Sequence, residues 1–392
     1  MGYVLFRDME KSSMKIAFLS HLDLNLYIFR LPIMTELIKQ GHTVYAICPR
    51  GEKFNEFEQY GIKALDYKIS RKSLNPFKEL KTIRNIYHVI KPLNLDVLHN
   101  FTVKPNIYGS IAGRLSKIKM IINSVTGMGS FFIQENKKAK AVRVVIEKLY
   151  KEANKKASFV IFQNSDDMKY FIDKSLVQKN QAVLIKSSGI DSEVFDINKS
   201  DTTKLEQLKN ELNIKNELVV LMVARAIWDK GVKEYYEAAR ILSKTYTNVK
   251  FIYVGDTDEG NHSCANRAFL TSSNVLWLGH RDDILELTAI SDIYVLPSYR
   301  EGVPRTLLEA AVMSKPIVTT DAIGCREVVD DGYNGLLVKV KDSKALAIGI
   351  EKLIQDADLR ETMGENGRIK VLKEFDVKIV VQKYMEVYEK NI

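Results

Sequence analysis

The stretch IYVLPSYREGVPRTLLEA, residues 293–310, contains one complete repeating unit of the fold. The apolar run Ile293–Leu296 predicts a buried strand, and the Pro- and Gly-containing residues 297–304 predict a loop. A helix starts near Arg305, where apolar residues begin to recur at helical spacing. A strand, a loop and a helix in this order form one unit of a parallel sheet. Ligands of such sheets bind at the carboxyl ends of the strands, so we expect the chemistry in this loop.

The same rhythm extends outward through the chain, and its restart after residue 196 predicts two domains. The length of 392 residues agrees, since domains usually have roughly 100–200 residues. Predicted strands are Lys15–Ser20, Thr43–Cys48, Lys63–Tyr67, Asp96–His99, Met120–Val125, Phe159–Gln163, Ala182–Lys186, Leu218–Ala224, Lys250–Val254, Val275–Leu278, Ile293–Leu296 and Ile317–Thr319. Predicted helices are Ile28–Lys39, Phe54–Tyr60, Lys78–Ile90, Ile107–Leu115, Ala139–Ala153, Asp166–Phe171, part of Asn198–Asn210, Val232–Thr245, Ile284–Ile290, Thr306–Met313 and Asp376–Lys390.

We therefore predict an α/β protein with two Rossmann-like, doubly wound parallel-sheet domains that face each other across a cleft. Residues 1–195 form the first domain and residues 196–375 the second. Residues 376–392 form a terminal helix that packs back toward the first domain.

The composition excludes several classes of protein. Apolar residues make up 46% and charged residues 27%, a globular mixture, and no run approaches the roughly 18 apolar residues of a membrane span. Residues 1–13 lack the apolar core of a signal peptide and are expected to be a frayed extension before Met14. The odd count of three cysteines without a CxxC pair predicts buried thiols in a reducing cytoplasm, not a disulfide framework or a zinc site.

The positive charge is confined to the first half. Residues 1–195 hold 31 Lys and Arg against 18 Asp and Glu, whereas residues 196–392 hold 27 against 31. This asymmetry predicts that the first half meets an anionic surface or substrate. Nucleic acid is disfavoured because the chain has no RNP-type aromatic motif, helix-turn-helix or zinc finger. Segment 137–156 alternates lysines with apolar residues, so it fits either an interfacial helix or a helix packed on its own sheet.

Two loops of the second half carry candidate site residues. Strand Leu218–Ala224 runs directly into Arg225, with Lys230 five residues on, and two cations at a strand end can bind a diphosphate. Glu301 and Glu309 stand eight residues apart, before and inside the predicted helix, where they can accept hydrogen bonds from two sets of hydroxyls. Either pair alone would be read as ordinary surface charge; together they predict a site for a nucleoside-diphosphate sugar.

The combination of Arg225-x4-Lys230 with Glu301-x7-Glu309 resembles the donor-site signature of glycosyltransferase family 4, whose members are retaining enzymes of the GT-B fold. Further similar motifs are VGD at 254–256, LGHRDDI at 278–284 and DGYNGL at 331–336. The resemblance spans about residues 14–390 and implies an enzyme, a hexosyltransferase. It also implies that the first domain, residues 1–195, faces the acceptor and the membrane, and that the second, residues 196–375, binds the nucleotide-sugar donor.

By this resemblance Arg225 and Lys230 bind the donor diphosphate, Glu301 faces the donor sugar and Glu309 takes the ribose hydroxyls. Glu301, Arg225 and Lys230 are the predicted catalytic residues. The amides of Gly302–Arg305 hold sugar and phosphate, and the Arg281–Ile284 loop flanks the base. The remaining predicted donor contacts are Gly255, Arg281, Ile284, Gly302, Val303, Pro304, Arg305 and Thr306.

Motifs in both halves narrow the resemblance to transferases of bacterial protein N-glycosylation; they lie at residues 20–21, 29–33, 70–77, 127–131, 224–234 and 261–265. This implies GalNAc transfer from UDP-GalNAc, in α-1,3 linkage, to undecaprenyl-diphospho-N,N′-diacetylbacillosamine at the inner face of the cytoplasmic membrane. The alternatives are a family 4 transferase of capsule or lipopolysaccharide assembly that uses another UDP-sugar, and, in a different class, a UDP-sugar 2-epimerase-like enzyme.

The mechanism expected from these residues is a same-face substitution in which the leaving diphosphate accepts the proton of the acceptor hydroxyl. No Asp-x-Asp motif stands at a strand end, so we expect no metal requirement and no cofactor. Two positions depart from the family: the loop at Ser20–Asn25 lacks glycine, and Phe101 stands where many members have histidine. The role of His21 is left open. His99 has either a structural or a sugar-contacting role, and Lys104 either binds the acceptor diphosphate or is solvated.

Overall fold

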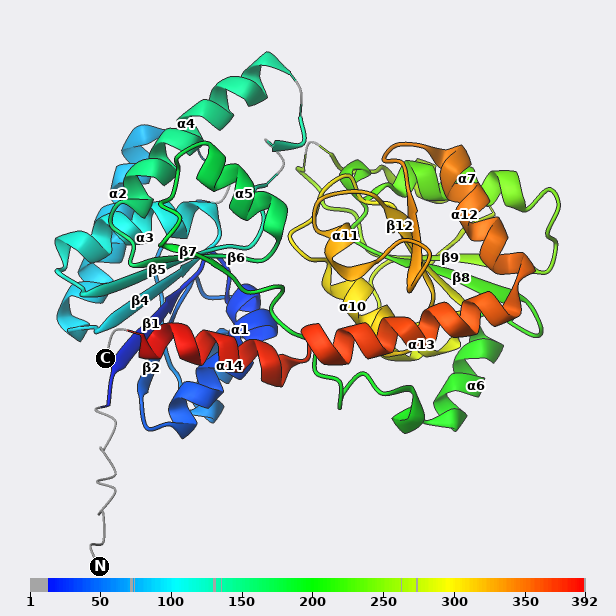
Figure 1. Cartoon of the computed structure of the whole chain (residues 1–392), viewed down its shortest axis with the longest axis horizontal. Helices are drawn as coiled ribbons and strands as arrows, with labels where there is room; N and C mark the ends of the chain where they lie inside the picture. The colour runs from blue at the N-terminus through cyan, green and yellow to red at the C-terminus, as the bar shows by residue number, and fades with distance from the viewer. Residues whose placement is uncertain are drawn as a thin grey trace, which may run out of the picture.

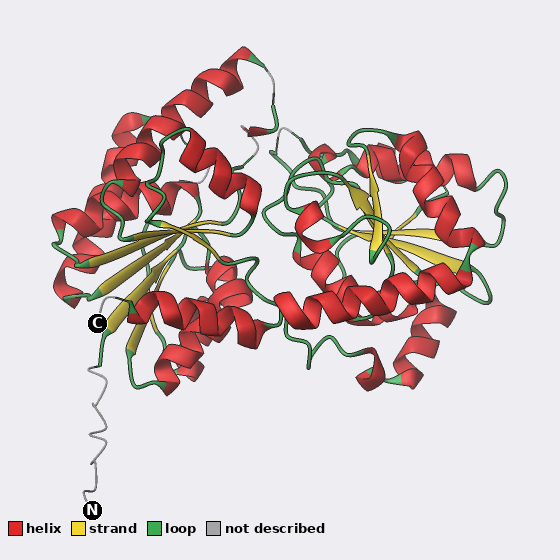
Figure 2. Ribbon diagram, in the orientation of Figure 1, coloured by secondary structure: helices red, strands yellow, loops and turns green. Residues whose placement is uncertain are grey.

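The computed structural model describes residues 13–70, 73, 75–129, 132–134, 136–261, 263–272 and 274–390. The expected extension before Met14, except Ser13, and parts of the motifs at 70–77, 127–131 and 261–265 lie outside the described residues. Two lobes lie side by side, each a parallel sheet with helices on both faces (Figures 1 and 2).

The first sheet has the strand order β3-β2-β1-β4-β5-β6-β7, and all its pairings are parallel. The order reverses between β1 and β4, so the carboxyl ends of these two strands are the switch point of this sheet. The strands are β1 (Lys15–Leu19), β2 (Thr43–Ile47), β3 (Lys63–Leu65), β4 (Val97–Phe101), β5 (Met120–Val125), β6 (Phe159–Phe162) and β7 (Ala182–Leu184).

The second sheet has the order β10-β9-β8-β11-β12-β13 and is also parallel throughout. Its order reverses between β8 and β11, the two strands whose loops carry the predicted donor residues. The strands are β8 (Leu218–Val223), β9 (Val249–Val254), β10 (Leu276–Trp277), β11 (Ile293–Leu296), β12 (Ile317–Thr320) and β13 (Gly335–Val338). Central strands are buried on both faces, which explains their continuous apolar runs.

Helices cover both faces of each sheet, and among the described residues none is long and apolar enough to cross a membrane. They are α1 (Asp23–Lys39), α2 (Pro76–Ile90), α3 (Val103–Leu115), α4 (Lys137–Asn154), α5 (Ser165–Asp173), α6 (Thr202–Glu211), α7 (Val232–Leu242), α8 (Arg267–Leu270), α9 (Ile284–Ile290), α10 (Arg305–Val312), α11 (Cys325–Val328), α12 (Ser343–Gln355), α13 (Ala357–Glu374) and α14 (Val377–Glu389).

The last helix ties the two lobes together. Helix α13 lies along the second lobe and α14 continues it beneath the first, where it packs against α1 (Figure 1). Tyr384 and Tyr388 of α14 are buried, and the Tyr388 hydroxyl lies 2.7 Å from Nδ1 of His99 on β4. His99 is fully buried and its Nε2 lies 2.8 Å from the Ser124 hydroxyl, so both ring nitrogens have partners within the protein, which favours the structural over the sugar-contacting role. Burial lowers the pKa of this histidine well below its usual value.

Three local expectations need correction. Helix α1 begins at Asp23, five residues before the predicted Ile28, and contains Pro32 as the predicted range did. Residues Phe54–Tyr60 form a 3-10 helix that ends at Gly61 in the left-handed conformation. Cys264 is partly exposed, whereas Cys48 and Cys325 are buried as expected.

Replacing Tyr388 with alanine is expected to destabilise the docking of α14 on the first domain. Loss of a buried aromatic ring typically costs about 3–5 kcal/mol of unfolding free energy. Tyr388→Phe keeps the ring but leaves Nδ1 of the buried His99 without the hydroxyl, so it is expected to cost about 1–3 kcal/mol. Urea unfolding followed by circular dichroism measures both; equal losses would show that ring packing contributes nothing.

Candidate active site

Two loops at the switch point of the second sheet bring together predicted catalytic residues from separate parts of the chain. One follows β8 and holds Lys230; the other follows β11 and holds Glu301. The Lys230 ammonium forms an ion pair with Oε1 of Glu301, and the two side chains are 21% and 12% exposed. A cation and a carboxylate thus meet at the place where an open α/β sheet binds its ligand.

The close approach of these loops depends on Gly231, which follows the short 3-10 turn Trp228–Lys230. Gly231 has φ +74°, and a Cβ there would lie inside the van der Waals radius of the Pro297 carbonyl, so only glycine fits. The Tyr299 amide donates to the Asp229 carbonyl at 2.9 Å and joins the loops directly. This framework fixes the distance between Lys230 and Glu301.

Glu309 lies on the inner face of α10, at the base of the same site. It is 9% exposed, and its Oε1 accepts from Nε of Arg305 at 2.9 Å. Burial raises the pKa of the Glu309 carboxyl, and Arg305 offsets this only in part. Arg305 also donates from Nη1 to the carbonyl of Ile28 at 2.8 Å, so this side chain reaches helix α1 of the first domain.

The two remaining predicted cations also have carboxylate partners. Arg225, which is 59% exposed, donates from Nη1 to Oδ2 of Asp258 at 2.7 Å. Arg281 binds Asp283 at 2.6 Å and Glu211 at 2.8 Å, and these hydrogen bonds raise its pKa. An anionic donor must therefore compete with carboxylates of the protein for each of these guanidinium groups.

The other predicted donor residues line the same edge of the sheet. Gly255 follows β9 with φ +145°, and a Cβ there would overlap the Ala224 carbonyl at the end of β8. Ile284 begins α9, which follows β10, while residues 302–304 and Thr306 surround the start of α10. The structure brings all the predicted residues to the carboxyl ends of β8, β9, β10 and β11; their roles stay predictions.

At the switch point of the first sheet lies a pair that the sequence did not single out as a unit. His21, after β1, places Nδ1 2.6 Å from the hydroxyl of Thr102, after β4. Thr102 has φ 75° and ψ 168°, a region that is essentially restricted to glycine and that costs about 1–3 kcal/mol for other residues. Such strain occurs preferentially at functional sites.

Lys104, the second residue of α3, has three hydrogen-bond partners among the described residues. Its ammonium donates to the carbonyls of Ser70 and Ser73 at 2.7 Å each and to Glu79 at 2.9 Å. The side chain thus links α3 to the residues before α2, and its role at an acceptor diphosphate stays a prediction.

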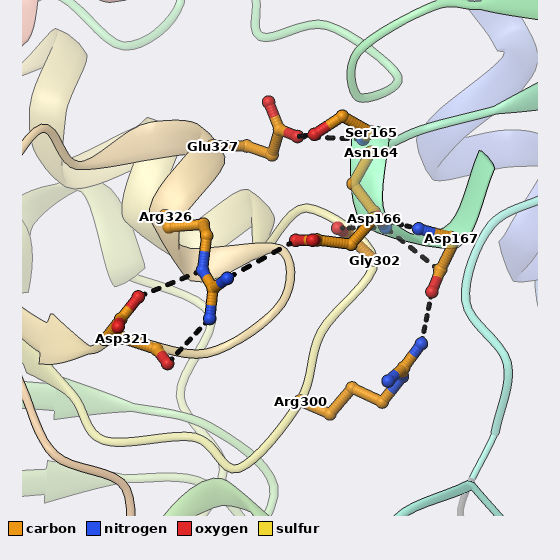
Figure 3. A network of polar contacts seen from close by, with 9 residues as sticks. All are labelled: Asn164, Ser165, Asp166, Asp167, Arg300, Gly302, Asp321, Arg326 and Glu327. Atoms are coloured by element: carbon orange, nitrogen blue, oxygen red, sulfur yellow. Dashed lines mark hydrogen bonds and ion pairs between the residues drawn. The ribbon is translucent and has the colours of Figure 1, made fainter. Parts of the chain in front are cut away.

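A network between the domains was not predicted (Figure 3). Residues 164–167, at the start of α5, contact Arg300, Gly302, Arg326 and Glu327 of the second domain. The signal was present in the sequence, because Asn-Ser-Asp-Asp follows a buried strand, where N-capping and ligand-binding residues are common.

Comparison with known proteins agrees with this architecture. The family model "Glycosyl transferase 4-like" matches residues 15–164, and "Glycosyl transferases group 1" matches residues 204–370. The N,N′-diacetylbacillosaminyl-diphospho-undecaprenol α-1,3-N-acetylgalactosaminyltransferase of Campylobacter jejuni is 39% identical over 97% of this chain and 99% of its own. The chain belongs to this glycosyltransferase family.

More distant relatives set the limits of the likeness. The UDP-Gal:α-D-GlcNAc-diphosphoundecaprenol α-1,3-galactosyltransferase of Escherichia coli is 27% identical, over 87% of both chains. The crystal structure of Anabaena HepE in complex with UDP and glucose aligns with a TM-score of 0.79 and 23% identity, covering 96% of this chain and 100% of HepE. The predictions of the GT-B fold, the family and a hexosyltransferase are confirmed, and the membership favours a transferase over the epimerase alternative.

Proposed function

We propose that the protein transfers GalNAc from UDP-GalNAc, with retention and in α-1,3 linkage, to undecaprenyl-diphospho-N,N′-diacetylbacillosamine. The observation that carries this proposal is the ion pair of Lys230 and Glu301 at the switch point of the second sheet. It lies in a chain that aligns at 39% identity, almost end to end, with a transferase named for that acceptor and sugar.

In this proposal the cations act on the diphosphate. Lys230 and Arg225 exchange their carboxylate partners for donor phosphate oxygens, and Lys230 stabilises the charge that grows on the leaving UDP. Glu301, released from Lys230, accepts hydrogen bonds from hydroxyls of the sugar, and Glu309 accepts from the ribose. The leaving phosphate takes the proton of the acceptor hydroxyl on the same face of the sugar, so the configuration at the anomeric carbon is retained.

We also propose that catalysis needs no divalent metal, because Lys230, Arg225 and the amides before α10 supply the positive charge that a metal would supply. Addition of excess chelator is expected to lower the transfer rate by less than about tenfold. Loss of a metal that took part in catalysis would have a larger effect, because removing one preorganised charge costs about 10²–10³-fold. Initial rates with and without chelator and Mg²⁺ measure this. Loss of activity that Mg²⁺ restores would contradict it.

The acceptor is a membrane lipid, so we propose that the first domain rests on the cytoplasmic face of an anionic membrane. Helix α4 reaches the outer edge of this domain (Figure 1). It exposes Val144, Val145 and Leu149, at 49%, 55% and 39%, among lysines. Exposed apolar side chains on a basic helix are typical of an interfacial helix.

Replacing Lys138, Lys148 and Lys151 with glutamine is expected to weaken binding to anionic vesicles by about 3 kcal/mol, because each basic residue near such a surface contributes about 1 kcal/mol. The matched control replaces Lys204, Lys209 and Lys215, which are exposed on the second domain, and is expected to bind like the wild type. Co-sedimentation with vesicles of rising anionic-lipid content measures both. Binding that ignores the lipid charge would refute the membrane proposal.

The proposed reaction is tested with purified protein and UDP-GalNAc, UDP-GlcNAc or UDP-Glc, each with and without undecaprenyl-diphospho-N,N′-diacetylbacillosamine. We expect lipid-linked product with UDP-GalNAc but with neither of the other two donors, and only when the acceptor is present. NMR of the product is expected to show the α configuration at the anomeric carbon. Product from another donor, or only with a GlcNAc-diphospholipid, would support instead a transferase of capsule or lipopolysaccharide assembly, which the 27% identical galactosyltransferase represents.

A further inference from the structure

Residues at the start of α5, in the first domain, form a hydrogen bond and an ion pair with the second-domain loop that carries Glu301. Four consecutive residues of the first domain, 164–167, each contact the second domain (Figure 3). Two of the four residues contact helix α11. The amide and hydroxyl of Ser165 donate to Oε1 of Glu327 at 2.9 and 2.6 Å. Asp166 faces Arg326 at 3.8 Å, and both side chains are partly exposed.

The other two of the four residues, Asn164 and Asp167, contact the neighbours of Glu301 in the chain. Nδ2 of Asn164 donates to the Gly302 carbonyl at 3.0 Å. The Arg300 guanidinium forms an ion pair with Asp167, whose side chain is fully buried. The chain on both sides of Glu301 is thus fixed by groups that belong to the other domain.

The side chains of Asn164 and Asp167 are also held by hydrogen bonds within the first domain. Asn164 caps α5, because its Oδ1 accepts from the Asp167 amide at 2.7 Å. Its Nδ2 also donates to Oδ2 of Asp167 at 3.0 Å. These two contacts between Asn164 and Asp167 involve no residue of the second domain, so they do not depend on Arg300 or Gly302.

The contact exists only when the domains are together. A Cβ on Gly302 would overlap the Thr126 carbonyl at the end of β5, so the two backbones touch. Nη2 of Arg300 also lies 3.2 Å from the sulfur of Met128 in the first domain. Separation of the domains would leave the Asp167 carboxylate without Arg300 and expose it to water.

We propose that Asn164 and Asp167 are positioning residues that align Glu301 with the donor sugar only when the two domains have closed. The proposal rests on the proposed transferase function and deepens it. Neither residue belongs to the predicted donor site; they act through Arg300 and Gly302. Within the second domain the loop is held by the Glu301 amide, which donates to the Ile323 carbonyl at 2.9 Å, and by the Tyr299 amide, which donates to the Asp229 carbonyl; the first domain adds the contacts to Arg300 and Gly302. A catalytic group completed by domain closure prevents chemistry before the acceptor domain is in place.

The test compares Asp167→Asn, Arg300→Gln and the double variant with the wild type. A displacement near 1 Å at a catalytic group can cost about 100-fold. We expect kcat to fall about 30- to 100-fold in each single variant, with the KM for donor and the Kd for UDP within about threefold, because the diphosphate contacts lie in the second domain. The double variant is expected to be no slower than the slower single variant, since both remove one interaction.

Asp166→Asn is the matched control: it lies one residue away, at the same interface, in a partly exposed pair, and is expected to keep kcat within threefold. If Asp167 only stabilised the fold, Asp167→Asn would lower the midpoint of thermal unfolding but would not lower kcat while KM stays unchanged. Unchanged kcat in Asp167→Asn and Arg300→Gln, or additive losses in the double variant, would overturn the proposal.

A readout without turnover separates this proposal from the proposed function. Small-angle X-ray scattering with bound UDP is expected to give a larger radius of gyration for Asp167→Asn than for the wild type and Asp166→Asn. If the wild type transfers no sugar to the chosen acceptor, the proposed function fails, and the scattering result still decides whether these residues hold the domains closed. Equal radii for all three proteins would refute the closure role.

Discussion

Glu301→Ala is expected to lower kcat/KM for transfer by at least about 1000-fold, the upper end of what loss of one preorganised group in an active site costs. The carboxylate is 12% exposed and its ion-pair partner is Lys230, so its removal has two consequences. The donor sugar loses an acceptor of its hydroxyl hydrogen bonds. Lys230 loses the residue that orients its ammonium before the diphosphate arrives.

Glu301→Gln separates these two consequences. The amide keeps an oxygen that can accept from a sugar hydroxyl, but it carries no charge to hold Lys230. We expect its kcat/KM to lie between those of the wild type and the alanine variant, while the Kd for UDP, measured by calorimetry, stays within about threefold in both. Retention of more than a tenth of the wild-type rate by the alanine variant would exclude Glu301 from the chemical step.

The second sheet shows how far the sequence carries a prediction of the site. Apolar runs such as Leu218–Val223 and Ile293–Leu296 are buried on both faces, and their short length and flanking turn residues predict central strands rather than helices. Adjacent parallel strands must end at the same edge, and this is why Lys230 and Glu301, 71 residues apart, could be expected together. The ion pair between them could not, because it depends on the crossing of two loops at Gly231.

Three later elements were not predicted, and the reasons differ. Helix α13 buries scattered positions such as Met363, Gly364 and Val371, so it shows no clear apolar stripe. Helix α12 does bury apolar residues at helical spacing, Leu346, Ala347, Ile350 and Leu353, so its pattern was present in the sequence. Strand β13 is a short apolar run at the edge of its sheet.

Contacts between domains are the least predictable part of the site. Asp167 lies in α5 of the first domain and Arg300 in the loop after β11 of the second, 133 residues apart, and no sequence pattern pairs them. Burial of this pair requires that both domains present matching surfaces, which no local pattern in either domain specifies. The residues that hold Glu301 in place are therefore visible only in the assembled structure.

Lys230→Gln is expected to lower kcat/KM by about 10²–10³-fold or more, because it removes a positive charge from the diphosphate as the negative charge on UDP grows. It has a second effect: Glu301 remains as an unpaired carboxylate beside the donor phosphates. UDP affinity should fall as well, and the loss should shrink at high salt, since screening weakens the repulsion between like charges. Lys233→Gln, in the first turn of α7 and 60% exposed, is the matched control and is expected to change neither quantity.

The double variant Lys230→Gln, Glu301→Gln decides whether that repulsion exists. If the unpaired carboxylate opposes the diphosphate, removing its charge restores part of the UDP affinity that Lys230→Gln loses, although kcat stays low because both groups are gone. Calorimetric titration with UDP at two salt concentrations measures the recovery. If the double variant binds UDP no better than Lys230→Gln, the carboxylate does not face the phosphates, and the ion pair only orients the lysine.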